Sequence, residues 1–141
     1  MNSRIVQIAV VFLTFIVAVF RITEGSESII LHWDFGGNIT SYGSKYYIIF
    51  LPIVSSLLYM IFQKYAKDPY RMNCISKIAV TSNNTKALVR YIHIVAPLVL
   101  VVLLYVTLCS AQIMELQPLF IITIICVVIL FYVYTYRRIE K

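Results

Sequence analysis

The chain has 141 residues, of which 61% are hydrophobic and only 13% are charged, and its mean hydropathy is +0.88. Soluble domains carry roughly 45–50% apolar and about 25% charged residues, so this composition excludes an ordinary soluble domain and favours a protein of the lipid bilayer. In so apolar a chain, the formal net charge of +6 indicates basic loops beside anionic lipid and not nucleic-acid binding.

Four apolar stretches have interiors without Asp, Glu, Lys or Arg and are long enough to span a membrane. They predict an all-α membrane protein, one integral membrane domain over residues 1–141, with four transmembrane helices. The expected helices cover residues 5–21, 46–63, 91–113 and 117–136. The first stretch could also be a cleaved signal peptide. It is long for one, and no clear A-x-A site follows it, so we expect a retained helix.

The loops between the expected helices differ in charge, and this difference predicts the orientation. Three carboxylates lie in the loop 22–45, whereas the loop 64–90 carries six basic residues against one acidic residue, Asp68. Lys and Arg accumulate on the cytoplasmic side of membranes. Both termini are therefore predicted to be cytoplasmic, with the loop 22–45 outside. Within the basic loop, Thr81 or Ser82 is expected to cap a helix that continues into the third span.

The loop 22–45 contains the only tryptophan and three of the four glycines of the chain. From Ile29 the apolar residues alternate, which predicts an extended segment with Ile29, Leu31, Trp33 and Phe35 on one face. Ile30, His32 and Asp34 would then share the other face. Gly36-Gly37-Asn38 predicts a chain reversal. Ser41 or Ser44 is expected to cap the second helix.

Lys45 is unusual at the start of a helix, because a cation there opposes the helix dipole. We therefore expect a partner for it, either Asp34 or a lipid phosphate. His32 and Asp34 could also ligate a metal, but two ligands are too few without help from elsewhere in the chain. The sequence predicts neither a metal nor a cofactor.

Several kinds of chemistry have no counterpart in the sequence. No Asp, Glu, Lys or Arg lies deep in the four spans, which argues against a proton-coupled transporter. Catalytic motifs such as HExxH, GxSxG and a phosphate-binding glycine loop are absent. The cysteines Cys74, Cys109 and Cys126 are scattered and show no metal-binding spacing. We expect a protein that is not an enzyme.

One pattern in the first loop resembles a known family. It consists of His32-Trp33-Asp34, Gly37, Tyr42-Gly43-Ser44-Lys45 and then Pro52. It is similar to a bacterial membrane domain of unknown function found at the N-terminus of SdpI-type toxin-immunity proteins. The likeness is specific over residues 30–52. This chain departs from the family in having Ser28-Ile29-Ile30-Leu31, without prolines, before the histidine, and in ending after four helices without the further membrane region.

The resemblance implies a protein of the bacterial cytoplasmic (inner) membrane that uses the outer loop to recognise an envelope-active peptide. Signalling through the basic loop, homo-oligomerisation, and a secreted peptide toxin or a cytoplasmic regulator as partner are part of this hypothesis. A small oligomeric transporter or permease component is an alternative, and a structural subunit of a membrane complex is another. The predicted binding residues are His32, Trp33, Asp34, Gly37, Tyr42, Gly43, Ser44 and Lys45.

Overall fold

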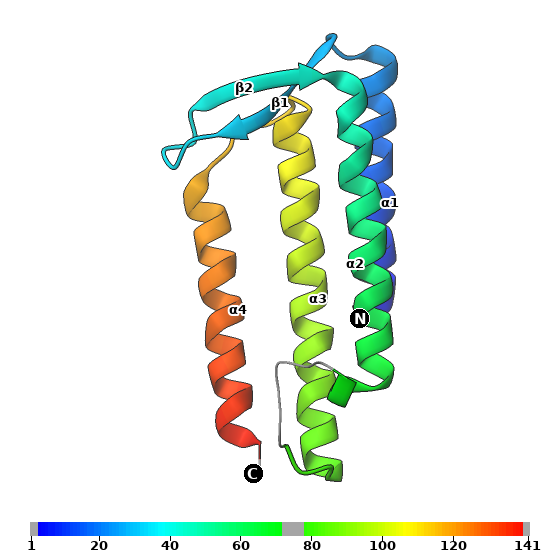
Figure 1. Cartoon of the computed structure of the whole chain (residues 1–141), viewed down its shortest axis with the longest axis vertical. Helices are drawn as coiled ribbons and strands as arrows, with labels where there is room; N and C mark the ends of the chain where they lie inside the picture. The colour runs from blue at the N-terminus through cyan, green and yellow to red at the C-terminus, as the bar shows by residue number, and fades with distance from the viewer. Residues whose placement is uncertain (1–2, 72–77, 140–141) are drawn as a thin grey trace.

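A computed structural model describes residues 3–71 and 78–139 of the chain. In this part, four long helices run side by side and a β-hairpin lies across one end of them (Figure 1). All four are long and apolar enough to cross a membrane. The helices are α1 (Ser3–Glu24), α2 (Phe50–Lys67), α3 (Ser82–Ser110) and α4 (Pro118–Arg138), the strands are β1 (Ser28–Trp33) and β2 (Ile39–Ser44), and the short 3₁₀ helices are η1 (Lys45–Ile49) and η2 (Pro69–Arg71).

The helix α3 occupies the centre of the bundle and packs against α1, α2 and α4. In contrast, only 6% of the apolar membrane-spanning segment of α4 is buried against the rest of the protein. Its exposed side chains are mostly apolar, as expected for a helix in contact with acyl chains. Its backbone N–H and C=O groups bond to one another within the helix and need no partner from lipid.

Polar side chains within the bundle bond to one another or to their own helix. The amide of Gln7, on α1, accepts a hydrogen bond from Gln63 Nε2 of α2 at 3.0 Å, and its own nitrogen donates to Ser3 Oγ at 3.0 Å. Thr14 Oγ1 donates to the carbonyl of Val10 at 2.9 Å. Such interhelical amide pairs help to hold transmembrane helices together.

The third span begins before its apolar stretch, and the second begins with a 3₁₀ turn. Thr81 is the N-cap of α3, and its hydroxyl accepts from Asn84 N at 3.2 Å. The cap expected at Thr81 or Ser82 is therefore confirmed, and α3 continues from Ser82 into the predicted span 91–113, as expected, and ends at Ser110. The second span starts with η1, and Pro52 lies in the first turn of α2, a part of a helix where proline is tolerated. Cys74 and part of the predicted loop 64–90 lie outside the described residues.

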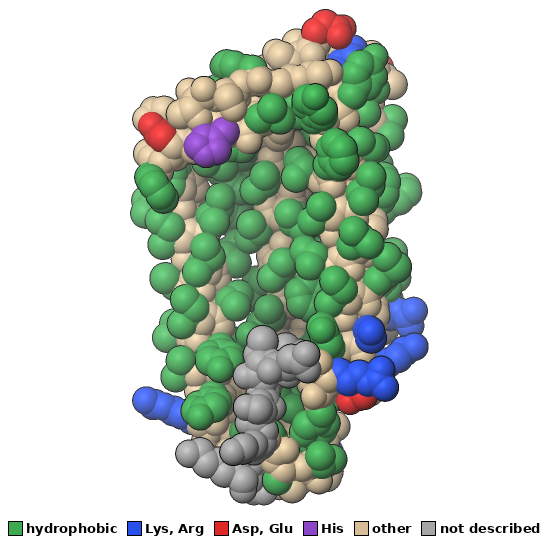
Figure 2. Space-filling view, viewed as in Figure 1, with side chains coloured by type: hydrophobic (Ala, Val, Ile, Leu, Met, Phe, Trp, Pro, Cys, Tyr) green, Lys and Arg blue, Asp and Glu red, His purple; other side chains and the backbone are tan. Residues whose placement is uncertain are grey.

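The two ends of the bundle differ in charge (Figure 2). At the end where α1 and α3 begin and α2 and α4 finish, here called the basic end, Asp68 is the one acidic residue among those described. The opposite end, called the hairpin end, carries more acidic than basic residues. The described basic residues of the basic end are Arg4, Lys64, Lys67, Arg71, Lys86, Arg90, Arg137 and Arg138; the hairpin end holds Glu24, Glu27, Asp34 and Glu115 with Arg21 and Lys45.

Candidate functional site

The hairpin of β1 and β2 is antiparallel but irregular. Ile30 pairs with Tyr42, His32 with Ser41, and Trp33 with Ile39, so Leu31 and Thr40 have no direct partner. Each irregularity shifts the faces of the strand by one residue. Ile29 and Ile30, which pair regularly before the first irregularity, are both buried, whereas Leu31 is exposed. The strict alternation predicted from Ile29 is therefore wrong beyond the first residues, because the sequence pattern does not reveal the bulge.

The base of the hairpin is anchored to the helices by apolar packing and by two polar contacts. Ile29 is buried in a cluster with Ala18, Ile48 and Ala111. The hydroxyl of Ser110, at the end of α3, donates to the carbonyl of Ile30 at 2.6 Å. Gln112 Nε2 donates to the carbonyl of Ser28 at 3.2 Å. These contacts fix β1 against the end of α3.

The tip of the hairpin is organised around the Asp34 carboxylate. Asp34 Oδ1 accepts from the backbone N–H groups of Gly36 and Asn38, both at 2.8 Å, and Oδ2 accepts from Asn38 Nδ2 at 2.9 Å. The hydrogen bond from the Asn38 side chain is the main cause that lowers the pKa of Asp34, and the backbone bonds add to it. The carboxylate therefore stabilises the turn as an internal acceptor.

Gly37 is required by the shape of the hairpin, and the absence of a side chain at Gly43 leaves room for that of Leu31. Gly37 has a φ of +86°, and a Cβ atom there would lie 3.0 Å from the carbonyl oxygen of Leu116 and 3.1 Å from the Pro118 ring. A Cβ atom at Gly43 would collide with the side chain of Leu31. The chain reversal predicted at residues 36–38 is confirmed, since these residues lie in the turn between β1 and β2. Gly37 also brings the tip against the start of α4.

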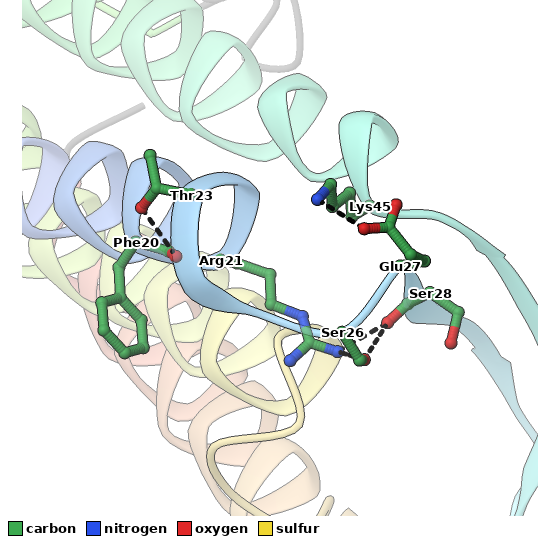
Figure 3. Close-up of polar contacts among 7 residues, drawn as sticks. All are labelled: Phe20, Arg21, Thr23, Ser26, Glu27, Ser28 and Lys45. Atoms are coloured by element: carbon green, nitrogen blue, oxygen red, sulfur yellow. Dashed lines mark hydrogen bonds and ion pairs between the residues drawn. The ribbon is translucent and has the colours of Figure 1, made fainter.

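Lys45 pairs with Glu27 (Figure 3), and not with Asp34 as predicted. Its Nζ lies 2.9 Å from Glu27 Oε1, and its backbone N–H donates to the carbonyl of Glu27 at 3.0 Å. The predicted Lys45–Asp34 pair is therefore wrong: Asp34 bonds at the tip of the hairpin, whereas Lys45 closes the base. The predicted serine cap is also wrong. Ser44 precedes η1 without a side-chain cap bond, and Ser41 lies within β2.

Arg21 is a residue of this region that the sequence analysis did not select (Figure 3). It lies near the end of α1 and is 8% exposed. Its Nη2 donates to Ser26 Oγ and to the carbonyl of Ser28, each at 2.5 Å. The guanidinium therefore holds the connection between α1 and β1. An arginine just after an apolar span is usually assigned to the membrane interface, so its inward contacts had no distinctive pattern.

A cleft of about 780 Å³ lies between the hairpin and the connection from α3 to α4. Trp33, Gly37 and Tyr42 are the predicted site residues that line it; His32, Asp34, Gly43, Ser44 and Lys45 do not. The opposite wall comes from residues 112–118, which the sequence analysis did not connect with the loop. The cleft combines aromatic and aliphatic side chains with the polar residues Gln112, Glu115 and Gln117. Such a combination suits an extended peptide or another partly apolar ligand.

The second wall of the cleft is held in place by Tyr105 of α3. Its hydroxyl accepts from the backbone N–H of Gln117 at 2.6 Å and bonds to the carbonyl of Glu115 at 3.2 Å. Its ring lies against that of Phe120, with centroids 4.5 Å apart. A tyrosine inside an apolar run gave no sign of this role, since the contact partners follow it by ten residues or more.

The residues considered for metal binding have partners within the hairpin. His32 Nδ1 lies 2.5 Å from Thr40 Oγ1, and the Asp34 carboxylate accepts the bonds of the tip. Within residues 3–71 and 78–139, no group of three or more His, Cys, Asp or Glu side chains is placed to hold a metal ion. Cys109 is buried and Cys126 is exposed, and both are free thiols.

Together, the four apolar helices define a multi-pass membrane protein. In a comparison with known proteins, residues 9–55 are similar to a domain of unknown function, DUF1648. The matched segment contains most of α1, the whole hairpin and the start of α2. No curated protein and no solved structure matches the chain.

Proposed function

We propose that this protein is a non-enzymatic receptor of the bacterial cytoplasmic membrane, of the SdpI-type immunity kind, and that it binds an envelope-active peptide in the cleft beside the hairpin. The observation that carries the proposal is the cleft itself. It places Trp33 and Tyr42 of the resembling motif opposite the α3–α4 connection. Aromatic side chains contribute much of the contact energy in peptide recognition.

The proposed orientation has the hairpin end outside the cell. Its support is the charge asymmetry, with the basic residues gathered at the opposite end (Figure 2), because Lys and Arg are retained on the cytoplasmic side. A fluorescent protein fused to the C-terminus should fluoresce in this orientation, whereas alkaline phosphatase fused there should be inactive. The reverse pair of results would place the hairpin in the cytoplasm and contradict the proposal.

The hairpin is suited to bind an extended peptide along β2. Nearly all of β2 is exposed, and its outer edge faces no further strand in the two-stranded sheet, whereas carbonyls of β1 are already bonded to Ser110 and Gln112. An extended peptide can add to such an edge through main-chain hydrogen bonds, while neighbouring pockets select its side chains. The cleft lies beside Ile39 and Tyr42 of the same strand.

The experiment is a survival assay in a sensitive bacterium that expresses the chain, challenged with a panel of envelope-active peptides. The wild-type chain should raise survival against at least one peptide. The double variant Trp33→Ala, Tyr42→Ala should lose this protection, and Phe35→Ala should keep it. Phe35 is the matched control, because it is an exposed aromatic of the same hairpin that does not line the cleft.

Membrane levels of each variant must be equal for the comparison to hold, which immunoblotting of isolated membranes measures. Unchanged killing curves for the whole panel would remove the support for immunity. A stable stoichiometric partner in a gentle detergent pull-down would then favour the structural-subunit alternative, and substrate uptake into proteoliposomes would favour a transporter component.

A further inference from the structure

A second cavity, of about 340 Å³, lies between α3 and α4 at the basic end. It is remote from the hairpin. One wall is the first part of α3, with Asn83, Lys86, Ala87, Arg90 and Tyr91, and the other is the last part of α4, with Phe131, Tyr134, Thr135 and Arg138. The helices are antiparallel, so the N-terminal turns of one meet the C-terminal turns of the other (Figure 1).

Helical spacing explains why these side chains share one cavity. Lys86 and Arg90 are four residues apart and so lie on one face of α3. On α4, Phe131, Thr135 and Arg138 recur at the spacing of one helix face in the same way. Between them, Ala87 adds little bulk. The rings of Tyr91 and Tyr132 meet with centroids 6.4 Å apart and join the two helices.

The cavity is lined by three cations and, among the described residues, by no carboxylate. Lys86 and Arg90 have no ion-pair partner in the described part of the chain. Arg138 is positioned by its own helix, with its guanidinium 4.8 Å from the centroid of the Tyr134 ring. Like charges four residues apart on a helix destabilise it. A bound anion would relieve this repulsion.

From this arrangement we infer that the cavity binds the phosphate group of an anionic phospholipid. The cations face a space that is also lined by Tyr91, Phe131 and Tyr134, and the adjoining surface of α4 is apolar and exposed. A phospholipid offers both parts of the required chemistry: a negative phosphate for the three cations and acyl chains for the helix surface. Basic pockets between transmembrane helices are suited to such headgroups.

The inference does not depend on the proposed peptide-binding function, because the cavity lies at the other end of the helices and shares no residue with the cleft. A general attraction of basic loops to lipid would involve every basic residue at this end of the bundle. The proposed site instead requires three particular cations to act together, while equally basic residues nearby contribute little. Lys64, Lys67 and Arg71 line a different cavity, together with Asp68, and provide the comparison.

The test is lipid binding by the full chain, purified in an uncharged detergent and measured by native mass spectrometry. The probes are dioctanoyl-phosphatidylglycerol, dioctanoyl-phosphatidylcholine and inorganic phosphate. Phosphatidylglycerol should bind saturably at low ionic strength, and phosphatidylcholine should bind at least tenfold more weakly. Each basic side chain near an anionic headgroup is worth roughly fivefold in affinity, so Lys86→Gln, Arg90→Gln, Arg138→Gln together should weaken binding about 100-fold.

The matched control removes the same charge at the same end, through Lys64→Gln, Lys67→Gln, Arg71→Gln, and should weaken binding less than about threefold. Equal losses in the two triple variants would overturn the inference, because any basic residue would then serve. Equal binding of phosphatidylcholine would also overturn it. Displacement of the lipid by millimolar inorganic phosphate would show a site for soluble anions instead of a lipid site.

Folding of the variants is checked by gel filtration and by the thermal unfolding temperature in detergent. If the cavity triple variant fails to fold, Lys86→Gln and Arg90→Gln are measured singly, and each should weaken phosphatidylglycerol binding roughly fivefold. The variant Arg90→Lys, Arg138→Lys retains the charges and should bind within a few-fold of the wild type. Loss of binding in this charge-preserving variant would contradict the electrostatic basis of the site.

Discussion

Replacing Gly37 with alanine tests the structure of the hairpin tip most directly. The residue has a φ of +86°, and a side chain in a left-handed conformation costs about 1–2 kcal/mol. The added Cβ would also lie 3.0 Å from the Leu116 carbonyl oxygen, which is backbone and cannot move away as a flexible side chain would. We expect Gly37→Ala to destabilise the closed tip by about 2 kcal/mol, equivalent to an approximately 30-fold rise in its opening equilibrium.

Hydrogen exchange of the hairpin amides, followed by mass spectrometry on protein in detergent, measures this opening. Exchange should accelerate in the segments 28–44 and 112–118, because the tip contacts both. Gly36→Ala is the matched control: its Cβ would meet only the exposed side chains of Asn38 and Asp34, so we expect less than about a fivefold change. Equal acceleration in the two variants would refute the reasoning that a left-handed glycine seats the tip against α4.

Three further predictions concern polar contacts of the same region. Hydrogen bonds lower the pKa of Asp34 below its ordinary 3.8, so its ionised form stabilises the hairpin above that pH. This stabilisation disappears as the pH falls through the lower folded pKa, and tryptophan fluorescence should change below about pH 4. The variant Asp34→Asn should lack this step. Glu27→Lys should destabilise the base of the hairpin by about 0.2–1 kcal/mol, because it breaks the ion pair with Lys45. Adding Lys45→Glu should restore the protection of the hairpin amides from hydrogen exchange. If protection is not restored, the ion pair contributes nothing to the stability of the hairpin. Ser110→Ala leaves the buried carbonyl of Ile30 without its hydrogen bond and should lower the free energy of unfolding by about 1–3 kcal/mol in a thermal unfolding assay. Ser56→Ala is the control and should have a smaller effect, because the hydroxyl of Ser56 bonds within its own helix.

The predictable part of the structure is the part that depends on local sequence. Four helices that could span a membrane follow from apolar runs alone, because a helix satisfies its backbone bonds without partners elsewhere in the chain. The cap at Thr81 and the reversal at Gly36-Gly37-Asn38 are likewise local. The partner of Lys45, which was predicted wrongly, depends on contacts between distant segments. Lys45 finds Glu27 because the two strands place them together at the base, and no spacing rule relates residues 18 apart across a bulged hairpin.

In the candidate site too, local features were predicted from the sequence and contacts between distant segments were not. The motif residues of the first loop were selected from the sequence, but the wall formed by residues 112–118 was not. Ser110 and Gln112 are polar residues at the end of an apolar run, and this is the one feature that could have drawn attention to them. A polar residue at that place is ordinarily assigned to the membrane interface, so its bond to β1 becomes visible only in three dimensions.

The contacts of the motif residues separate architecture from recognition. Asp34, Gly37, Gly43 and Lys45 are each explained by a bond or a close approach within the chain. Their place in the motif is therefore accounted for by the shape of the hairpin and requires no ligand. Trp33 and Tyr42 line the cleft instead, so they remain the motif residues most suited to contact a partner.

This separation bears on what the domain match at residues 9–55 contributes. That segment supplies the hairpin wall of the cleft, while the opposite wall, residues 112–118, lies outside the match. The domain match therefore covers the Trp33 side of the cleft and not the facing surface. We expect ligand preference to follow the connection between α3 and α4. Exchanging Ile113 and Met114 for polar residues should then change which peptide is bound, while hairpin stability, measured by hydrogen exchange, stays unaltered. A change in hairpin protection without a change in preference would instead assign this connection a purely structural role.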